Sequence, residues 1–219
     1  MSKFLKTLCA LNPYRRARQL AWRTSMLGLA RGERITRYAM YQRLRTVGGC
    51  LPFRSGKALS VSHSGKLLDV LGFEATELVE ANYPDHSFVD LRFPDDTFDC
   101  VVSDMVLAHV VGNPQDAVNE SRRVLRKGGI AVHTSIFMYP INRWPTDLWR
   151  FSPDALQWLH RGFSRIIEVG GWGNPYVWEV LKDGMFSQGV PHAKWHPYHR
   201  IAMRNDPERP SCVWIIAEK

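Results

Sequence analysis

A turn of small residues follows an apolar segment near the first quarter of the chain. The sequence KALSVSHSGKLLDVLGF, Lys57 to Phe73, predicts a strand over Ala58–Val61, a turn, and a helix over Lys66–Leu71. Many α/β proteins build a cofactor site in this order, because small side chains let backbone N–H groups approach a ligand. The residues of this segment that we expect to contact a cofactor are Ser60, Ser62, His63, Ser64 and Gly65.

An acid stands at the end of the next predicted strand, near Thr76 to Ala81. Glu80 lies about 18 residues beyond the start of the turn, a spacing close to that at which dinucleotide sites place an acid on the ribose hydroxyls. The alternative is that Glu80 is a solvated acid at a strand end. Glu80 is therefore a candidate ligand for a ribose.

Strand and helix patterns alternate from about residue 57, which predicts a mainly parallel sheet covered on both faces. A short strand is expected near Phe88, followed by a buried strand over Phe98 to Asp104. The remaining elements are helices that begin at Pro114 and at Ser152-Pro153, and strands over Ile130 to Phe137, in FSRIIEVGG and in CVWIIAEK. We expect a basic helical arm or cap over residues 1–50 and an α/β domain over residues 51–219.

Positive charge is concentrated at the start of the chain. The net charge is +8, but residues 1–45 hold eleven Lys or Arg and one acid, Glu33, which gives +10 and leaves 8 − 10 = −2 for the remainder. The apolar spacing predicts amphipathic helices broken near Gly28 and Gly32. This arm is either a helical cap with its arginines in water or a surface for phosphates of anionic lipid, nucleic acid or a nucleotide-linked substrate. Phe4, Leu8 and Leu11 could form a small membrane-facing stripe, and an Arg-rich start is also typical of organellar transit peptides.

No run approaches the roughly 18 apolar residues of a membrane span, so we expect a soluble, cytoplasmic protein. The four cysteines, Cys9, Cys50, Cys100 and Cys212, form no CxxC pair, which disfavours a zinc site or a disulfide framework and favours a reducing compartment. Composition does not determine the oligomeric state.

Two further stretches resemble a known enzyme family. LRFPDDTFDCVVSDMVLAHVVGNPQDAVNESRRVLRKGGIAVHT, Leu91 to Thr134, resembles the second half of class I S-adenosylmethionine-dependent methyltransferases of the UbiE-like, type 11 group. YPINRWPTDLWRFSPDAL, Tyr139 to Leu156, resembles the DxWRFxP signature of a subgroup that often accompanies glycan and natural-product pathways. The resemblance implies a Rossmann-like, seven-stranded sheet with an antiparallel last strand, and S-adenosylmethionine across the carboxyl ends of the first strands.

The resemblance also implies roles for individual residues. Ser60 stands where the family has an acid that binds the cofactor's amino group, and Ser62 and Ser64 stand at family glycines. A serine cannot replace the charge of the acid and resists a positive φ. The family pattern further places Asp90 and Leu91 beside the adenine, Ser103 and Asp104 beside the methionine portion, and His109 in a helix that follows, with Ala108 where the family usually has Glu.

The loop Tyr139 to Phe151 follows the fifth strand, where the family places substrate-facing elements. Arginine and aromatic side chains suit sugar faces, phosphates or carboxylates. Alternatively, Trp149 locks the loop onto the core and Arg150 pairs with a nearby acid. The candidate acceptor-binding residues are Tyr139, Asn142, Arg143, Trp144, Trp149, Arg150 and, from a later loop, His192.

Three residues are candidate general bases: His109, Asp147 and His133. A hydroxyl acceptor loses its proton during methyl transfer, so it needs such a base. His192, His196 and His199 have a spacing that would suit metal ligands on a helix, but Pro191 and Pro197 disfavour a continuous helix and no metal is expected.

The sequence favours S-adenosylmethionine-dependent methyl transfer to the oxygen or nitrogen of a small-molecule or glycan-like acceptor. The altered turn at Ser60 to Gly65 leaves open a methyltransferase-fold binding or scaffold protein without catalysis. A nucleic-acid methyltransferase that uses the basic arm is a third hypothesis, although SDMV stands where amino-methylating enzymes of nucleic acids have an NPPY-type tetrapeptide.

Overall fold

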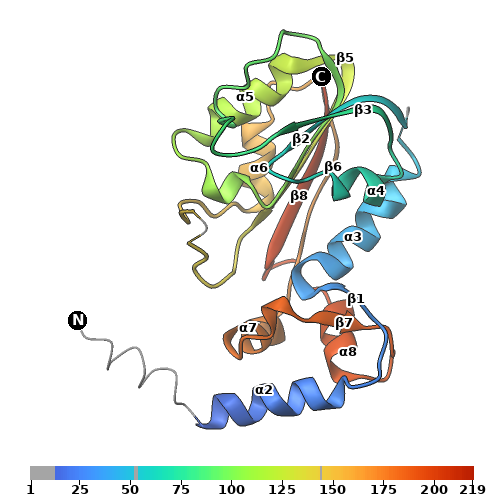
Figure 1. Ribbon diagram of the computed structural model, residues 1–219, viewed down its shortest axis with the longest axis vertical. Coiled ribbons are helices and arrows are strands. Elements are labelled where there is room, and N and C mark those ends of the chain that lie inside the picture. Colours follow the sequence, from blue (N-terminus) through green and yellow to red (C-terminus); the bar gives the residue numbers. More distant parts are fainter. Residues whose placement is uncertain (1–12, 52–53, 144) are drawn as a thin grey trace, which may run out of the picture.

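The computed structural model describes residues 13–51, 54–143 and 145–219 (Figure 1). Its main sheet has six strands in the order β3-β2-β4-β5-β8-β6, and a small second sheet pairs β1 with β7. The strands are β1 (Arg31–Arg34), β2 (Ser55–Val61), β3 (Glu74–Ala81), β4 (Phe98–Asp104), β5 (Leu125–Ile136), β6 (Arg165–Trp172), β7 (Gly189–Pro191) and β8 (Cys212–Glu218). The helices are α2 (Pro13–Ser25), α3 (Ile35–Gly48), α4 (Lys66–Leu71), α5 (Pro114–Val124), α6 (Pro153–Leu159), α7 (Pro175–Lys182) and α8 (Pro197–Met203), with short 3-10 helices η1 (Leu107–His109) and η2 (Met185–Ser187).

The main sheet is mostly parallel, as the alternating pattern predicts. β2 pairs in parallel with β3 and with β4, and β4 pairs in parallel with β5. β8 runs antiparallel to both of its neighbours, β5 and β6. Because Val61 of β2 pairs with Ser103 of β4, the carboxyl ends of these two strands meet at one edge of the sheet.

The predicted count of seven strands is wrong: in the described residues the main sheet has six. The segment near Phe88, where the missing strand was expected, forms only an isolated bridge between Ser87 and Asp90. Leu91 N donates to Glu120 Oε2 at 2.8 Å, and Leu91 O accepts from Arg123 Nη2 at 2.6 Å. The backbone of this segment is therefore satisfied by side chains of α5 instead of by a strand ladder.

Local signals located most other boundaries correctly. The predicted helix Lys66–Leu71 and strand Phe98–Asp104 are confirmed to the residue. Ser152 caps α6, with Ala155 N donating to Ser152 Oγ at 3.1 Å, as its hydroxyl before a proline predicts. β5 begins at Leu125, earlier than predicted, so Gly128 and Gly129 lie within the strand.

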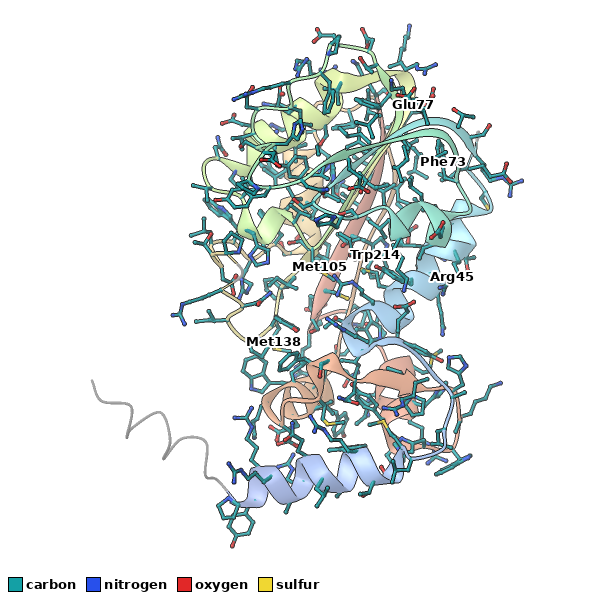
Figure 2. The ribbon with its side chains drawn as sticks, in the orientation of Figure 1. Arg45, Phe73, Glu77, Met105, Met138 and Trp214 are labelled. Carbon is teal, nitrogen blue, oxygen red and sulfur yellow. The ribbon has the colours of Figure 1, made fainter. Side chains whose placement is uncertain are left out.

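Two apolar clusters cover the two faces of the main sheet. One joins Ala58, Val102 and Trp214 of the sheet to Tyr41 and Leu44 of α3 and to residues of α4. The other joins the alternate strand residues to α5 and α6. Figure 2 places Met105 and Trp214 together in the middle of the molecule, where the sheet faces α3. The result is a three-layer α/β fold with helices on both faces.

The N-terminal residues form two helices with a break between them, near the glycines that predict it. Gly28 has φ 73° after α2, and the short strand β1 leads into α3. α3 packs in the same core cluster as the sheet, whereas α2 lies against α7 and α8 at the lower end of Figure 1. The division at residue 50 stays a prediction, and Phe4, Leu8 and Leu11 lie outside the described residues. None of the helices in the described ranges has the length and hydropathy that a bilayer span requires.

Candidate functional site

A pocket of about 430 Å³ lies over the carboxyl ends of β2, β3 and β4. Its walls come from the turn after β2, from residues 83–89 after β3, from residues 104–111 after β4, and from Asn142 and Pro145. One further wall residue, Arg37, comes from α3. We call this cavity the strand-end pocket. Its position is the one at which open α/β sheets bind ligands.

The turn after β2 has the backbone of a glycine loop without its glycines. Ser62 has φ 53° and His63 has φ 60°, a left-handed conformation that L side chains adopt at a cost of about 1–3 kcal/mol each. His63 N donates to Asn82 Oδ1 at 2.8 Å, and Ser62 N donates to Ala81 O at 3.0 Å. These bonds hold the turn in place, so its geometry persists although its side chains have changed.

Ser64 ties this turn to the end of β4. Its buried Oγ donates to Val61 O at 2.5 Å and accepts from Asp104 N at 2.7 Å. Behind it, a Cβ placed on Gly65 would lie 3.3 Å from Glu80 Oε1 and 3.8 Å from Ser60 Oγ. Gly65 therefore lies close to both polar side chains, and an added side chain would crowd them.

An ion pair forms part of the pocket wall. Arg37 Nε lies 2.7 Å from Asp104 Oδ2, and Tyr41 Oη donates to the same oxygen at 2.6 Å. Thr134 Oγ1 donates to Asp104 Oδ1 at 2.6 Å. Burial opposes the charge of Arg37, but the Asp104 carboxylate outweighs it and raises the pKa of the guanidinium. Burial and the negative charge of Asp104 also raise the pKa of Tyr41, which keeps it a hydrogen-bond donor.

The predicted cofactor residues divide into those near the pocket and those away from it. Ser62, His63 and Asp104 line the pocket. Ser64 and Gly65 follow directly in the same turn but do not line it. Ser60 is buried behind the turn with its Oγ unpartnered, and Glu80 is exposed beside Gly65. The others lie away from the pocket: exposed Asp90 faces Arg92 at 3.3 Å, Leu91 is buried against α5, and the buried Ser103 Oγ bonds His133 Nδ1 at 2.7 Å.

Several pocket residues carried no sequence signal that pointed to them. Ser87, Phe88 and Val89 occupy the wall near which Asp90 was expected. His86 also lines the pocket, and its Nδ1 is buried without a hydrogen-bond partner among the described residues. Arg37 appeared only as one arginine among many in the arm, and its place at the pocket follows from the packing of α3.

Of the three candidate bases, His109 alone lines the pocket. Its Nδ1 bonds Thr146 O; because a carbonyl oxygen only accepts, Nδ1 carries the proton and Nε2 is left as an acceptor. Asp147 is buried in a two-oxygen pair with Arg150, which holds the pKa of the Asp147 carboxyl below its usual range. His133 is fully buried in β5, where burial lowers its pKa well below the ordinary value.

Hydrogen bonds hold the loop after β5 in place. Asp147 Oδ2 accepts from Asn142 N at 2.6 Å, and Trp149 Nε1 donates to Val110 O at 2.9 Å. Among the predicted acceptor-binding residues, Asn142 lines the pocket, Arg143 is exposed, and half-buried Tyr139 has a pKa that burial raises. Trp144 lies outside the described residues.

The histidines after β7 lie in the lower part of the molecule. The ring of His192 is 6.4 Å from that of Tyr38 between centroids. His196 Nδ1 accepts from Tyr198 N at 3.1 Å at the start of α8, and His199 Nδ1 lies 2.9 Å from Pro191 O. Across the part of the chain that the structure describes, no group of three metal-ligating side chains comes together.

Comparison with known proteins gives a family match for the part of the chain that includes β2 and β4. Residues 54–133 match the model of a methyltransferase domain family, which includes β2, the altered turn and β4. A search of curated protein sequences gave no match.

Solved structures share the fold at low sequence identity. The cyclase SpnF is 18% identical with a TM-score of 0.52, and the alignment covers 83% of this chain and 81% of that one. A putative methyltransferase of Bacillus halodurans is 15% identical with a TM-score of 0.52, and the alignment covers 81% of this chain and 99% of that one. An S-adenosylmethionine-dependent methyltransferase of Mesorhizobium loti is 12% identical with a TM-score of 0.52, and the alignment covers 84% of this chain and 98% of that one.

These identities show a common fold and no more, and a cyclase among the neighbours means that the fold alone does not determine the reaction. The family match is specific to residues 54–133, where the strand-end pocket has its β2 and β4 walls. The chain therefore has the Rossmann-like fold of these methyltransferase structures, and residues 54–133 are similar to a methyltransferase domain family.

Proposed function

We propose that the protein binds S-adenosylmethionine in the strand-end pocket and transfers its methyl group to the oxygen or nitrogen of a small-molecule or glycan-like acceptor. The observation that carries this proposal is the Arg37–Asp104 ion pair on the pocket wall. The methionine portion of the cofactor is a zwitterion, and a cation beside an anion complements both of its charges. Arg37 would meet the carboxylate and Asp104 the ammonium group.

The chemistry of the other pocket groups fits the same ligand. Ser60 has no charge, so Asp104 at the end of the neighbouring strand replaces the acid that related enzymes have on the first strand. The turn Ser62-His63 has the positive φ values of a glycine loop, and the side chain of His86 borders the pocket, where it would contact the nucleoside. When bound, the cofactor supplies an electrophilic methyl group on a sulfonium.

His109 is the residue to which we assign proton removal from a hydroxyl acceptor. Its Nδ1 is occupied by Thr146 O, which leaves Nε2 as the proton acceptor. Pro145 and Asn142 from the loop after β5 border the same pocket and would contact the acceptor. An amine acceptor that arrives uncharged would depend less on His109.

A binding protein without catalysis is the second candidate. Tyr41 and Thr134 already donate to the Asp104 carboxylate, so the ammonium group of a cofactor must compete with those bonds, which favours a binding or scaffold protein that does not use the cofactor. Nucleic-acid methylation is the third hypothesis, and it would use the basic arm.

Calorimetric titration with S-adenosylmethionine and with its demethylated product tests the cofactor binding on which methyl transfer to any acceptor depends. We expect both ligands to bind the wild-type protein, Asp104→Asn to weaken binding at least about 10-fold, and Asp90→Asn, an outward-facing control, to bind as wild type. Absence of heat at millimolar ligand would refute the proposal. If Asp90→Asn alone lost binding, we would conclude that the cofactor lies on the other side of residues 87–90.

A further inference from the structure

One side of α2 is docked on the protein. Arg18 Nη2 lies 2.8 Å from the buried Asp183 Oδ2 of the segment after α7, and Ser25 Oγ lies 3.1 Å from His196 Nε2. The ring of Trp22 is 5.7 Å from that of Tyr198 between centroids. Positions 18, 22 and 25 follow the spacing of one helix face, so this face is fixed against α7 and α8.

The opposite side of α2 carries a second stripe at the same spacing. It consists of Arg16, Leu20, Arg23 and Leu27, the last in the turn after the helix, and we call it the outward stripe. Leu20 is 63% exposed and Leu27 is 73% exposed. Neither Arg16 nor Arg23 has an ion pair with a described residue. Exposed leucines that alternate with uncompensated arginines along one helix face suit a partner that is both apolar and anionic.

Basic and aromatic residues also occur elsewhere at this end of the molecule. The sequence has no acidic residue before Glu33. Trp195, beside His196 at the docked helix, is 64% exposed, and Lys194 next to it is exposed as well. Tryptophan and basic side chains together are typical of segments that lie at a membrane surface.

The shape of the molecule suits a flat partner. Figure 1 shows α2 lying across the lower end of the molecule, below α7 and α8, with the main sheet at the other end. A helix in this position can rest lengthwise on a plane. Nucleic acid would satisfy Arg16 and Arg23 but would leave Leu20 and Leu27 in water, whereas the interface of a bilayer accommodates both kinds of side chain.

We propose that the outward stripe of α2 docks the protein on membrane surfaces that contain anionic phospholipid. The leucines enter the interface between headgroups and acyl chains, and the arginines meet lipid phosphates and carboxylates. Docking is peripheral and reversible, because the stripe covers only about three helical turns. It does not depend on the proposed methyl transfer.

Sedimentation with vesicles of phosphatidylcholine, with and without phosphatidylserine, tests this proposal on the full chain. We expect wild-type protein to bind only the anionic vesicles, and less at high salt. Arg16→Gln with Arg23→Gln should weaken binding about 30-fold, and Leu20→Gln with Leu27→Gln at least about 10-fold. The matched control, Leu78→Gln with Arg45→Gln, removes an exposed leucine and an exposed arginine elsewhere and should bind as wild type.

Circular dichroism of each variant checks that α2 still folds. Equal binding of neutral and anionic vesicles, or binding unaffected by the leucine changes, would overturn the proposal. A parallel titration with duplex DNA and RNA distinguishes the other anionic partner. Tight duplex binding that depends on Arg16 and Arg23, together with no binding to vesicles, would show that the partner of the outward stripe is nucleic acid and not a membrane.

Discussion

Arg37→Met removes the positive charge from the strand-end pocket and keeps an unbranched apolar side chain in place of the arginine stem. The Arg37 side chain is 25% exposed and that of Asp104 is 12% exposed, so the pair is largely shielded from water. Removing one partner of a fully buried pair costs about 3–5 kcal/mol. Asp104 keeps its bonds from Tyr41 and Thr134 and some contact with water, so we expect a loss of about 2 kcal/mol in the free energy of unfolding.

The same change should weaken the binding of S-adenosylmethionine by a free energy comparable to its effect on unfolding. A charge-assisted hydrogen bond contributes about 1.5–3 kcal/mol, which corresponds to roughly 10- to 100-fold in the dissociation constant. Calorimetric titration at constant salt measures that constant, and urea unfolding measures the stability. Binding and stability are thereby separated for one substitution.

Tyr41→Phe is the matched control, since Tyr41 donates to the same oxygen of Asp104 from the same helix. It should lose about 1–2 kcal/mol of stability for one bond to a carboxylate and leave cofactor affinity within about threefold of wild type. If both variants lose affinity equally, Arg37 acts only by positioning Asp104. If Arg37→Met binds the cofactor as wild type does, the zwitterion argument is wrong.

Three further predictions concern stability. Gly48→Ala should lower the free energy of unfolding in urea by more than about 3 kcal/mol, because the new Cβ would clash with the backbone oxygen of Leu71 in α4. The neighbouring Gly49→Ala is the control. Its new Cβ would lie 3.5 Å from the nearest atom, so the loss should be less than about 1 kcal/mol. Burial lowers the pKa of His160 from 6.5 to about 4. The stability that the folded state gains from an uncharged His160 is therefore fully present above pH 6.5 and is lost as the pH falls toward 4. Unfolding at pH 7 and pH 5 should therefore differ by about 2 kcal/mol from this group, a difference that His160→Gln removes. Ser64→Ala should cost about 1–3 kcal/mol, because it leaves the buried N–H of Asp104 without its acceptor, and an unchanged unfolding midpoint would contradict that role.

The elements that sequence patterns predicted well are those with local causes. The cap at Ser152, the apolar run Phe98–Asp104 and the proline that opens α5 depend on neighbours in sequence, and each is found in the structure. The expected strand near Phe88 depends on a partner strand. Side chains from α5 pair with the backbone of Leu91 in its place, and no pattern within the segment indicates that competition.

The candidate site shows the same limit. The turn after β2 and Asp104 were predictable because they follow apolar strands directly. Arg37 and Tyr41 were not, since they precede Asp104 by 67 and 63 residues, and only the packing of α3 on the sheet brings them to it. The conformation of Ser62 also contradicts its residue type, because a positive φ is rare for serine.

The uncharged side chain of Ser60 and the Arg37–Asp104 ion pair lie near the same ends of strands β2 and β4. Ser60 is fully buried and its Oγ has no hydrogen-bond partner among the described residues, so a carboxylate there would be desolvated without compensation. Ser60 pairs with Val102 in the sheet, and Asp104 lies two positions further along β4, closer to the turn and within reach of α3. The negative charge therefore stands where a cation can balance it. Such a neutral pair attracts a zwitterion by its local dipole and not by net charge, so binding of the methionine portion should respond only weakly to ionic strength.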